Sequence, residues 1–225
     1  MTDLDSHANW PAFGDDSTDL VLTGRTVQVY GYDPSQGHRS LSIRHKAVAH
    51  DCPYTSRTFI CIANNSLHLD GATTNLIPQV LLREAGLIVN NTLKQHLSEP
   101  SSDDHCIICP TTNQKIHLEL NGTFSGFRTR ALTQDEIDRI DEYDIIWLTP
   151  NVEDWDPYDP EMEYRENRLM DGDGNVRMLG PDERRPSLDE KDRFLAEIAE
   201  ISNLIAGDEE EEEDPPTSLK RNTND

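Results

Sequence analysis

The sequence predicts a mainly β fold with one or two short helices, followed by an acidic, largely disordered tail that contains one amphipathic helix. Up to residue 150, short runs of β-branched and aromatic residues are separated by turn residues, a pattern typical of strands. After Pro150 the apolar content falls and acidic residues dominate. We therefore expect one core-forming β domain over residues 1–150.

The pattern within this β domain predicts seven strands and one helix. The strands are expected over residues 26–30, 41–49, 58–69, 106–108, 116–120, 123–130 and 143–148. Asn121-Gly122 is a typical hairpin turn between two of them. Residues 75–86 carry apolar side chains at helical spacing, and Gly86 is well placed to end that helix.

The tail divides by composition into three parts. Residues 151–186 predict an extended acidic linker with little periodicity. Residues 187–206 predict an amphipathic helix, because a capping-box pattern precedes one apolar stripe. Residues 207–225 include seven consecutive acids, which repel one another and stay solvated, so we expect a disordered acidic end.

The charge of the chain excludes two classes of partner. It has 43 Asp and Glu against 20 Lys and Arg among 225 residues, a formal net charge of −23. Direct binding to nucleic acid or to anionic lipid needs clustered positive charge, so we expect neither. No stretch approaches the roughly 20 apolar residues of a membrane span, and the start lacks a secretory signal. We expect an intracellular protein, cytoplasmic or nuclear.

The sequence does not favour a metal or cofactor site. Cys52, Cys61, Cys106 and Cys109 are too few and too dispersed for a disulfide framework. Cys106 and Cys109, with histidines nearby, suggest zinc, but a second closely spaced ligand pair is missing and both lie in an apolar strand. Residues 171–182 begin like a calcium loop but lack its glycine and its final glutamate. We predict buried thiols, with no metal and no cofactor.

Several short blocks, taken in order, resemble one known family. Leu4-Asp5-Ser6-His7-Ala8 is similar to the Asp-Ser/Thr-Gly-Ala loop of retropepsin-like aspartic peptidases. The blocks that follow are Thr23-Gly24-Arg25-Thr26-Val27, Asp51-Cys52-Pro53-Tyr54-Thr55, Asn75-Leu76-Ile77-Pro78, Arg83-Glu84-Ala85-Gly86, Asp103-Asp104-His105, Phe124-Ser125-Gly126-Phe127, Leu148-Thr149-Pro150 and Trp155-Asp156-Pro157-Tyr158. Their order resembles the retropepsin-like domain of copia-type retrotransposon polyproteins.

The resemblance implies a small β-barrel that hydrolyses a polypeptide substrate as a homodimer. It implies that Asp5 is the catalytic carboxylate and that Ser6 is the neighbouring hydroxyl that braces the loop. An aspartic peptidase needs two carboxylates that share one proton, and a retropepsin chain supplies one of them. A second Asp-Gly-Ala, at Asp70, lacks the intervening hydroxyl residue and predicts an ordinary turn.

Two departures from the family pattern argue against present activity. His7 stands where the family has a glycine that permits an unusual backbone conformation. Only four residues precede Asp5, so the copy looks truncated at its N-terminus, and Asp5 could lie in a frayed end. The alternative is a non-enzymatic acidic interaction protein. In it, the barrel is a scaffold, and the helix at 187–206 and the acidic end bind a basic partner.

Overall fold

The structure, a computed structural model, describes residues 1–30, 37–150, 155, 173 and 175. The chain divides into two compact units, Met1–Leu188 and Asp189–Asp225, and the second lies wholly outside the described residues. The predictions for the linker at 151–186, the helix at 187–206 and the acidic end at 207–225 fall outside the described residues, apart from three single positions in the linker.

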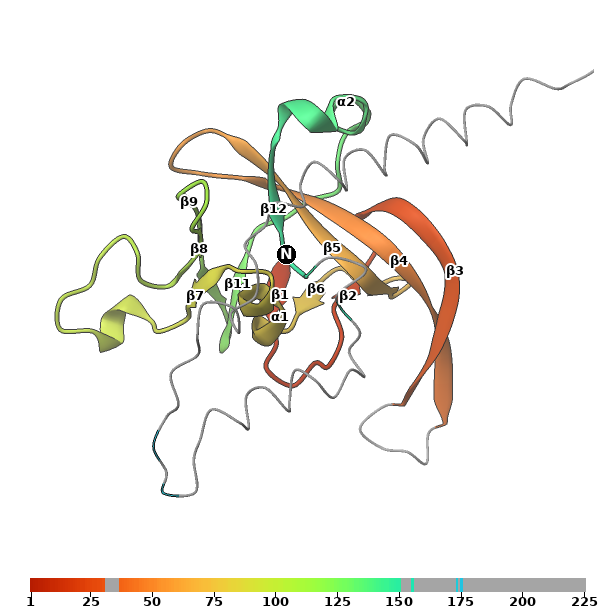
Figure 1. Ribbon diagram of the computed structural model, residues 1–225, viewed down its shortest axis with the longest axis horizontal. Coiled ribbons are helices and arrows are strands. Elements are labelled where there is room, and N and C mark those ends of the chain that lie inside the picture. The colour runs from red at the N-terminus through yellow and green to blue at the C-terminus, as the bar shows by residue number, and fades with distance from the viewer. Residues whose placement is uncertain (31–36, 151–154, 156–172, 174, 176–225) are drawn as a thin grey trace, which may run out of the picture. The chain divides into compact units, whose positions relative to one another are not determined.

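The larger of the two sheets in the described part of the chain has nine strands (Figure 1). Its strands pair in the order β10-β11-β1-β6-β2-β5-β4-β3, and β12 pairs with β5. The bounds are β1 Thr2–Leu4, β2 Ala12–Phe13, β3 Thr18–Tyr30, β4 His38–Asp51, β5 Thr58–His68, β6 Asn75–Ile77, β10 Glu119–Asn121, β11 Phe124–Phe127 and β12 Asp144–Trp147.

A second sheet and four short helical segments complete the described fold. The sheet has three antiparallel strands, β7 Ile88–Asn90, β8 Cys106–Cys109 and β9 Gln114–His117. The α-helices are α1 Gln79–Glu84 and α2 Gln134–Asp138, and single 3-10 turns span Lys94–His96 and Ile140–Glu142. The prediction of a mainly β fold with one or two short helices is therefore confirmed.

The expected barrel does not form among the described residues. A barrel needs its first and last strands to pair, whereas the path of this sheet ends at β10 on one side and β3 on the other. The strand β10 has only three residues, against thirteen in β3. These two edges are too unequal to pair along their lengths, and the sheet stays open.

The longest strands form the meander β3-β4-β5; β3 and β4 are longer than predicted, and β5 matches its prediction to within one residue. The strand β3 begins at Thr18 rather than at residue 26, because its irregular segment at Thr23-Gly24-Arg25 bends the strand without ending it. The pairing with β4 shifts register between Leu22 and Thr26, and Gly24 has a φ of 68°. Glycine adopts this left-handed conformation without the Cβ penalty of other residues.

The helix predicted over residues 75–86 is wrong in its first half. Asn75–Ile77 forms β6, and a six-residue helix follows it. The residue before a proline avoids the α conformation, so Pro78 keeps Ile77 extended. Gly86, with a φ of 84°, ends this segment as predicted.

The strand predicted over residues 116–120 is divided between the two sheets. Its first part belongs to β9 and its last part to β10, with Leu118 between them. The predicted hairpin at Asn121-Gly122 is confirmed, because Asn121 pairs with Phe124 and Gly122 has a φ of 64°. This passage of the chain from one sheet to the other places both sheets around the same core.

The main core contains buried side chains from both sheets and from α1. Its members include Leu4, Phe13, Val48, Phe59, Ile77, Leu82, Ile107, Ile116, Phe127 and Ile146. A smaller cluster gathers around Trp10 and Trp155. Among the described residues, no helix combines the length and the apolar character that crossing a membrane requires.

Candidate functional site

The first residues of the chain form a central strand rather than a frayed end. Strand β1 lies between β11, to which it is antiparallel, and β6, to which it is parallel (Figure 1). Thr2 is fully buried and Leu4 is 3% exposed. The carbonyl of Met1 accepts a hydrogen bond from the N–H of Asn75 at 2.9 Å. The position of Asp5 is therefore fixed by a strand that has neighbours on both sides.

Asp5 lies in a tight turn directly after β1. Its N–H donates to the carbonyl of Ile77 at 3.0 Å, which continues the pairing with β6 by one residue. Its Oδ1 accepts the N–H of His7 at 2.8 Å, so the carboxylate closes an Asx turn on its own backbone. The side chain of Asp5 is 22% exposed, which leaves the carboxylate accessible from one side.

The two residues after Asp5 are exposed at the surface. The Ser6 hydroxyl lies 3.2 Å from Nδ1 of His7, and that imidazole is 95% exposed. The brace on the Asp5 carboxylate is therefore the N–H of His7, and Ser6 contacts the ring. The φ of His7 is not in the left-handed region, so a side chain at this position causes no backbone strain.

Asp3 is a buried carboxylate within β1, two residues before Asp5. It is 6% exposed; its Oδ2 accepts from Nδ2 of Asn121 at 3.3 Å, and its Oδ1 has no hydrogen-bond partner among the described residues. A Cβ at Gly126 would collide with this Oδ1 and lie 2.7 Å from the carbonyl oxygen of Thr2. The close approach of β1 and β11 therefore requires glycine at 126. The sequence signal for this buried carboxylate was the pair of acids at positions 3 and 5. The sequence-based prediction named Asp5 and did not include Asp3.

Asp70 lies in an ordinary turn, as predicted, and belongs to the one candidate metal group among the described residues. Ligand atoms of Asp15, His68 and Asp70 lie within 4.8 Å of one another. His68 already has partners on both ring nitrogens, Nδ1 to Nζ of Lys46 at 3.0 Å and Nε2 to Asp70 at 2.8 Å. An ammonium only donates, so Nδ1 accepts and Nε2 carries the ring proton. Metal binding at Nε2 would have to displace that proton, and the arrangement does not favour a metal.

The cysteines are buried thiols, as the sequence predicts. All four are free and buried. Burial raises the pKa of Cys61 to about 12. A thiol with this pKa stays protonated at neutral pH and is a poor nucleophile.

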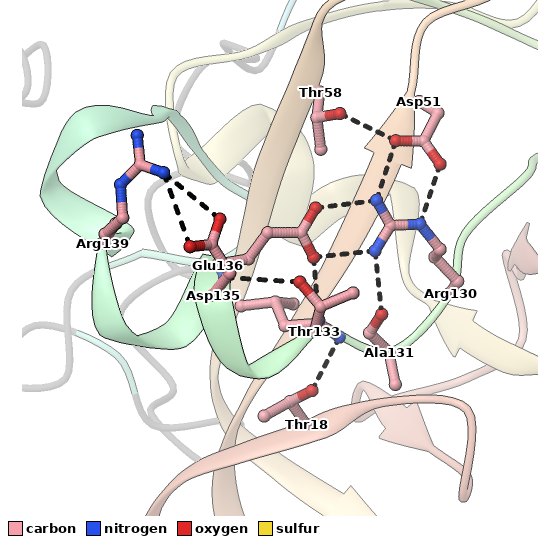
Figure 2. Close-up of polar contacts among 10 residues, drawn as sticks. Thr18, Asp51, Thr58, Arg130, Ala131, Thr133, Asp135, Glu136 and Arg139 are labelled. Atoms are coloured by element: carbon pink, nitrogen blue, oxygen red, sulfur yellow. Dashed lines mark hydrogen bonds and ion pairs between the residues drawn. The ribbon is translucent and has the colours of Figure 1, made fainter.

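The strongest group of polar contacts joins α2 to the sheet through Arg130 (Figure 2). The guanidinium makes two hydrogen bonds to Asp51, at 2.8 and 2.9 Å, and two to Glu136, both at 2.7 Å. Thr58 donates to Asp51 at 2.8 Å. Glu136 also accepts the N–H of Thr133 at 2.8 Å in a capping box at the start of α2. This group connects the end of β4, the start of β5 and α2.

The electrostatics of this Arg130 group favour the ionised forms. The hydrogen bonds from Arg130, aided by those from Thr133 and opposed by burial, lower the pKa of Glu136 to about 2. The hydrogen bonds to Glu136 and Asp51 raise the pKa of Arg130 above its ordinary value. The arrangement has no open position for a substrate, since both carboxylates are bound in bidentate fashion, so we assign it a role in stability.

The fold and the site define a mainly β chain with one partly exposed carboxylate at the end of a central strand. No protein-family model, curated protein or solved structure matches the chain.

Proposed function

We propose that the chain is a retropepsin-like domain derived from a copia-type retrotransposon polyprotein, and that Asp5 is its catalytic carboxylate. The observation that carries the proposal is the placement of Asp5. It follows a buried strand paired on both sides, its backbone is bound to Ile77, and its carboxylate orientation is set by the N–H of His7. Such fixed geometry is what a catalytic group requires.

The proposed enzyme is a homodimer, because the resemblance assigns one catalytic aspartate to each chain. In a dimer, a two-fold axis would bring Asp5 against Asp5 of a second copy. Two carboxylates about 3 Å apart do not both ionise, so the pair holds one proton. Oδ1 of Asp5 already accepts the His7 N–H, which leaves Oδ2 for the second carboxyl group or for water.

The proposed reaction is hydrolysis of a peptide bond by an activated water. The ionised carboxylate takes a proton from water while the water oxygen attacks the scissile carbonyl carbon. The protonated carboxyl group donates to the carbonyl oxygen, which becomes a hydroxyl in the tetrahedral intermediate. The first carboxyl group then gives its proton to the leaving nitrogen as the carbon–nitrogen bond breaks. The second carboxylate takes the proton from one hydroxyl of the intermediate, which becomes the carbonyl of the new acid. One water is consumed, and the pair again holds a single proton.

Asp5→Asn is expected to reduce hydrolysis of an unfolded polypeptide at about pH 5 by roughly 1,000-fold or more. Asparagine can still accept the N–H of His7, so the turn should persist and thermal unfolding should change little. The matched control is Asp15→Asn, because Asp15 is exposed and likewise accepts a backbone N–H, that of Gly71 at 3.0 Å. Equal activity in Asp5→Asn and the wild type would refute the assignment, and so would an inactive wild-type dimer.

A second candidate function is a non-enzymatic acidic interaction protein, and the net charge of −23 favours it. In this proposal the sheet is a scaffold, and residues 187–214 bind a basic partner through charge attraction. Deletion of residues 187–214 would then abolish binding to a basic polypeptide, whereas Asp5→Asn would have no effect. The opposite pattern would favour the peptidase.

A further inference from the structure

A bulge in β5 opposite His45 contains two consecutive asparagines. Arg44 pairs with Ser66 and Lys46 with Ala63, so Asn64 and Asn65 together oppose one residue of β4. Asn65 has a φ of 49°, a left-handed conformation in which asparagine is enriched. Bulges of this kind redirect a strand and its side chains. Both asparagines are buried, at 0% and 3% exposure.

The ring of His45 fixes the backbone of this bulge. Its Nδ1 lies 3.2 Å from the N–H of Asn65. A backbone N–H only donates, so this nitrogen must be the unprotonated one. The ring is buried, and burial lowers the pKa of His45; the Asn64 side chain opposes this effect and the charge of Arg25 adds to it. The bulge therefore depends on a neutral histidine.

The same bulge binds the chain that follows β12. Nε1 of Trp10 donates to the carbonyl of Asn65, and Nδ2 of Asn65 lies 3.5 Å from the carbonyl of Trp155. The rings of Trp10 and Trp155 pack edge to face, with centroids 6.2 Å apart. Nearer to β12, Oγ1 of Thr149 accepts the N–H of Asn64 at 2.7 Å. We call the contact of Trp155 with Asn65 and Trp10 the Trp155 anchor.

We propose that protonation of His45 releases the Trp155 anchor, so that mild acid frees Trp155 from the bulge in β5. A proton on Nδ1 places two donors face to face and removes the bond that fixes Asn65. The carbonyl and side chain of Asn65 then lose their orientation toward Trp10 and Trp155. The sheet itself is retained, because the register of β4 and β5 continues on both sides of the bulge.

The group near His45 that favours the added charge is the side chain of Asn64, which is a neutral amide. Val21 of β3 lies opposite in register, and Arg25 of β3 is the charged group that acts on the ring. On the β5 side the neighbours are the amides of Asn64 and Asn65. Trp10 and Trp155 beyond them are uncharged. A protonated imidazole would therefore be buried and subject to the positive charge of Arg25. This favours opening of the bulge over a charged ring within the closed structure.

Acrylamide quenching of tryptophan fluorescence between about pH 7.5 and pH 5 tests the proposal. The protein carries Trp147→Phe, so that only Trp10 and Trp155 emit. They are 9% and 5% exposed, and quenching should be weak at neutral pH. We expect the quenching constant to rise several-fold on acidification, while the far-UV circular dichroism of the sheet is unchanged.

His45→Asn supplies the decisive comparison, because its Oδ1 can accept the Asn65 N–H but does not titrate. The rise in quenching should be lost in this variant and retained in the matched control His96→Asn, at an exposed histidine. Should His45→Asn fail to fold, hydrogen exchange in the wild type replaces it. The amide of Asn65 should lose protection below about pH 6.5 relative to the other β5 amides. Quenching that rises equally in His45→Asn, or only together with loss of circular dichroism, would overturn the proposal.

Discussion

Arg130→Met should lower the free energy of unfolding by about 3 kcal/mol, measured by urea denaturation at neutral pH. The side chain of Glu136 is 7% exposed, and Arg130 supplies two of its hydrogen bonds. Removal of the guanidinium leaves the buried carboxylate of Glu136 with only Thr133 as its partner, and Asp51 with only Thr58 (Figure 2). An uncompensated buried charge is the costly outcome of breaking such a pair.

The matched control is Arg139→Met on the neighbouring turn. Arg139 pairs with Asp135 and Glu142, but all three side chains are more than half exposed, so the free energy of unfolding should change little.

Acid should weaken the same ion pair between Arg130 and Glu136 by protonating the carboxylate. Because the pKa of Glu136 is about 2 when folded and 4.5 at its ordinary value, its contribution is complete above about pH 4.5 and is lost as the pH falls toward 2. Equal losses in the two arginine variants would contradict the assignment.

Phe127→Ala should destabilise the fold by about 3–5 kcal/mol. Phe127 is fully buried in the main core, on the strand that pairs with β1, and its ring meets that of His50 edge to face at 5.7 Å. Truncation leaves a cavity between the sheets, directly beside the strand that positions Asp5. The same strand provides the control, because Phe124 is 52% exposed.

Phe124→Ala should change the free energy of unfolding by no more than about 0.5 kcal/mol. Thermal unfolding followed by circular dichroism measures both variants. A small effect of Phe127→Ala would show that β11 does not depend on this core. A large effect of Phe124→Ala would instead indicate that its exposed ring is covered in solution, for example by a second copy of the chain.

Local pattern was sufficient to predict the long strands β4 and β5, but it found only the last part of β3 and missed the short strands β1, β2 and β6. Strands β4 and β5 have enough β-branched residues to be read directly, and the Asn121-Gly122 hairpin follows from turn chemistry. Strands β1, β2 and β6 have three residues or fewer, and each exists because distant segments pair with it. No window of the sequence contains that information, so Asn75–Ile77 was assigned to the helix whose spacing it shares.

The candidate site likewise depends partly on neighbouring residues and partly on residues that are far apart in the sequence. Asp5 was found through a resemblance of short motifs, but the fixed geometry of its turn depends on Ile77, more than seventy residues away. The pairing of Arg130 with Asp51 is equally non-local. The capping box at Thr133 and Glu136, in contrast, is a Thr-x-x-Glu pattern that the sequence analysis could have used.

The association state of the wild-type chain, measured together with its activity, tests the central claim most directly. Sedimentation velocity over a range of concentrations at about pH 5 and at neutral pH determines whether a dimer forms. Peptidase activity is measured at the same concentrations. We expect a reversible dimer and a specific activity that rises as the dimer fraction rises. A chain that stays monomeric, or hydrolysis strictly proportional to chain concentration, would contradict a site built from Asp5 of two copies.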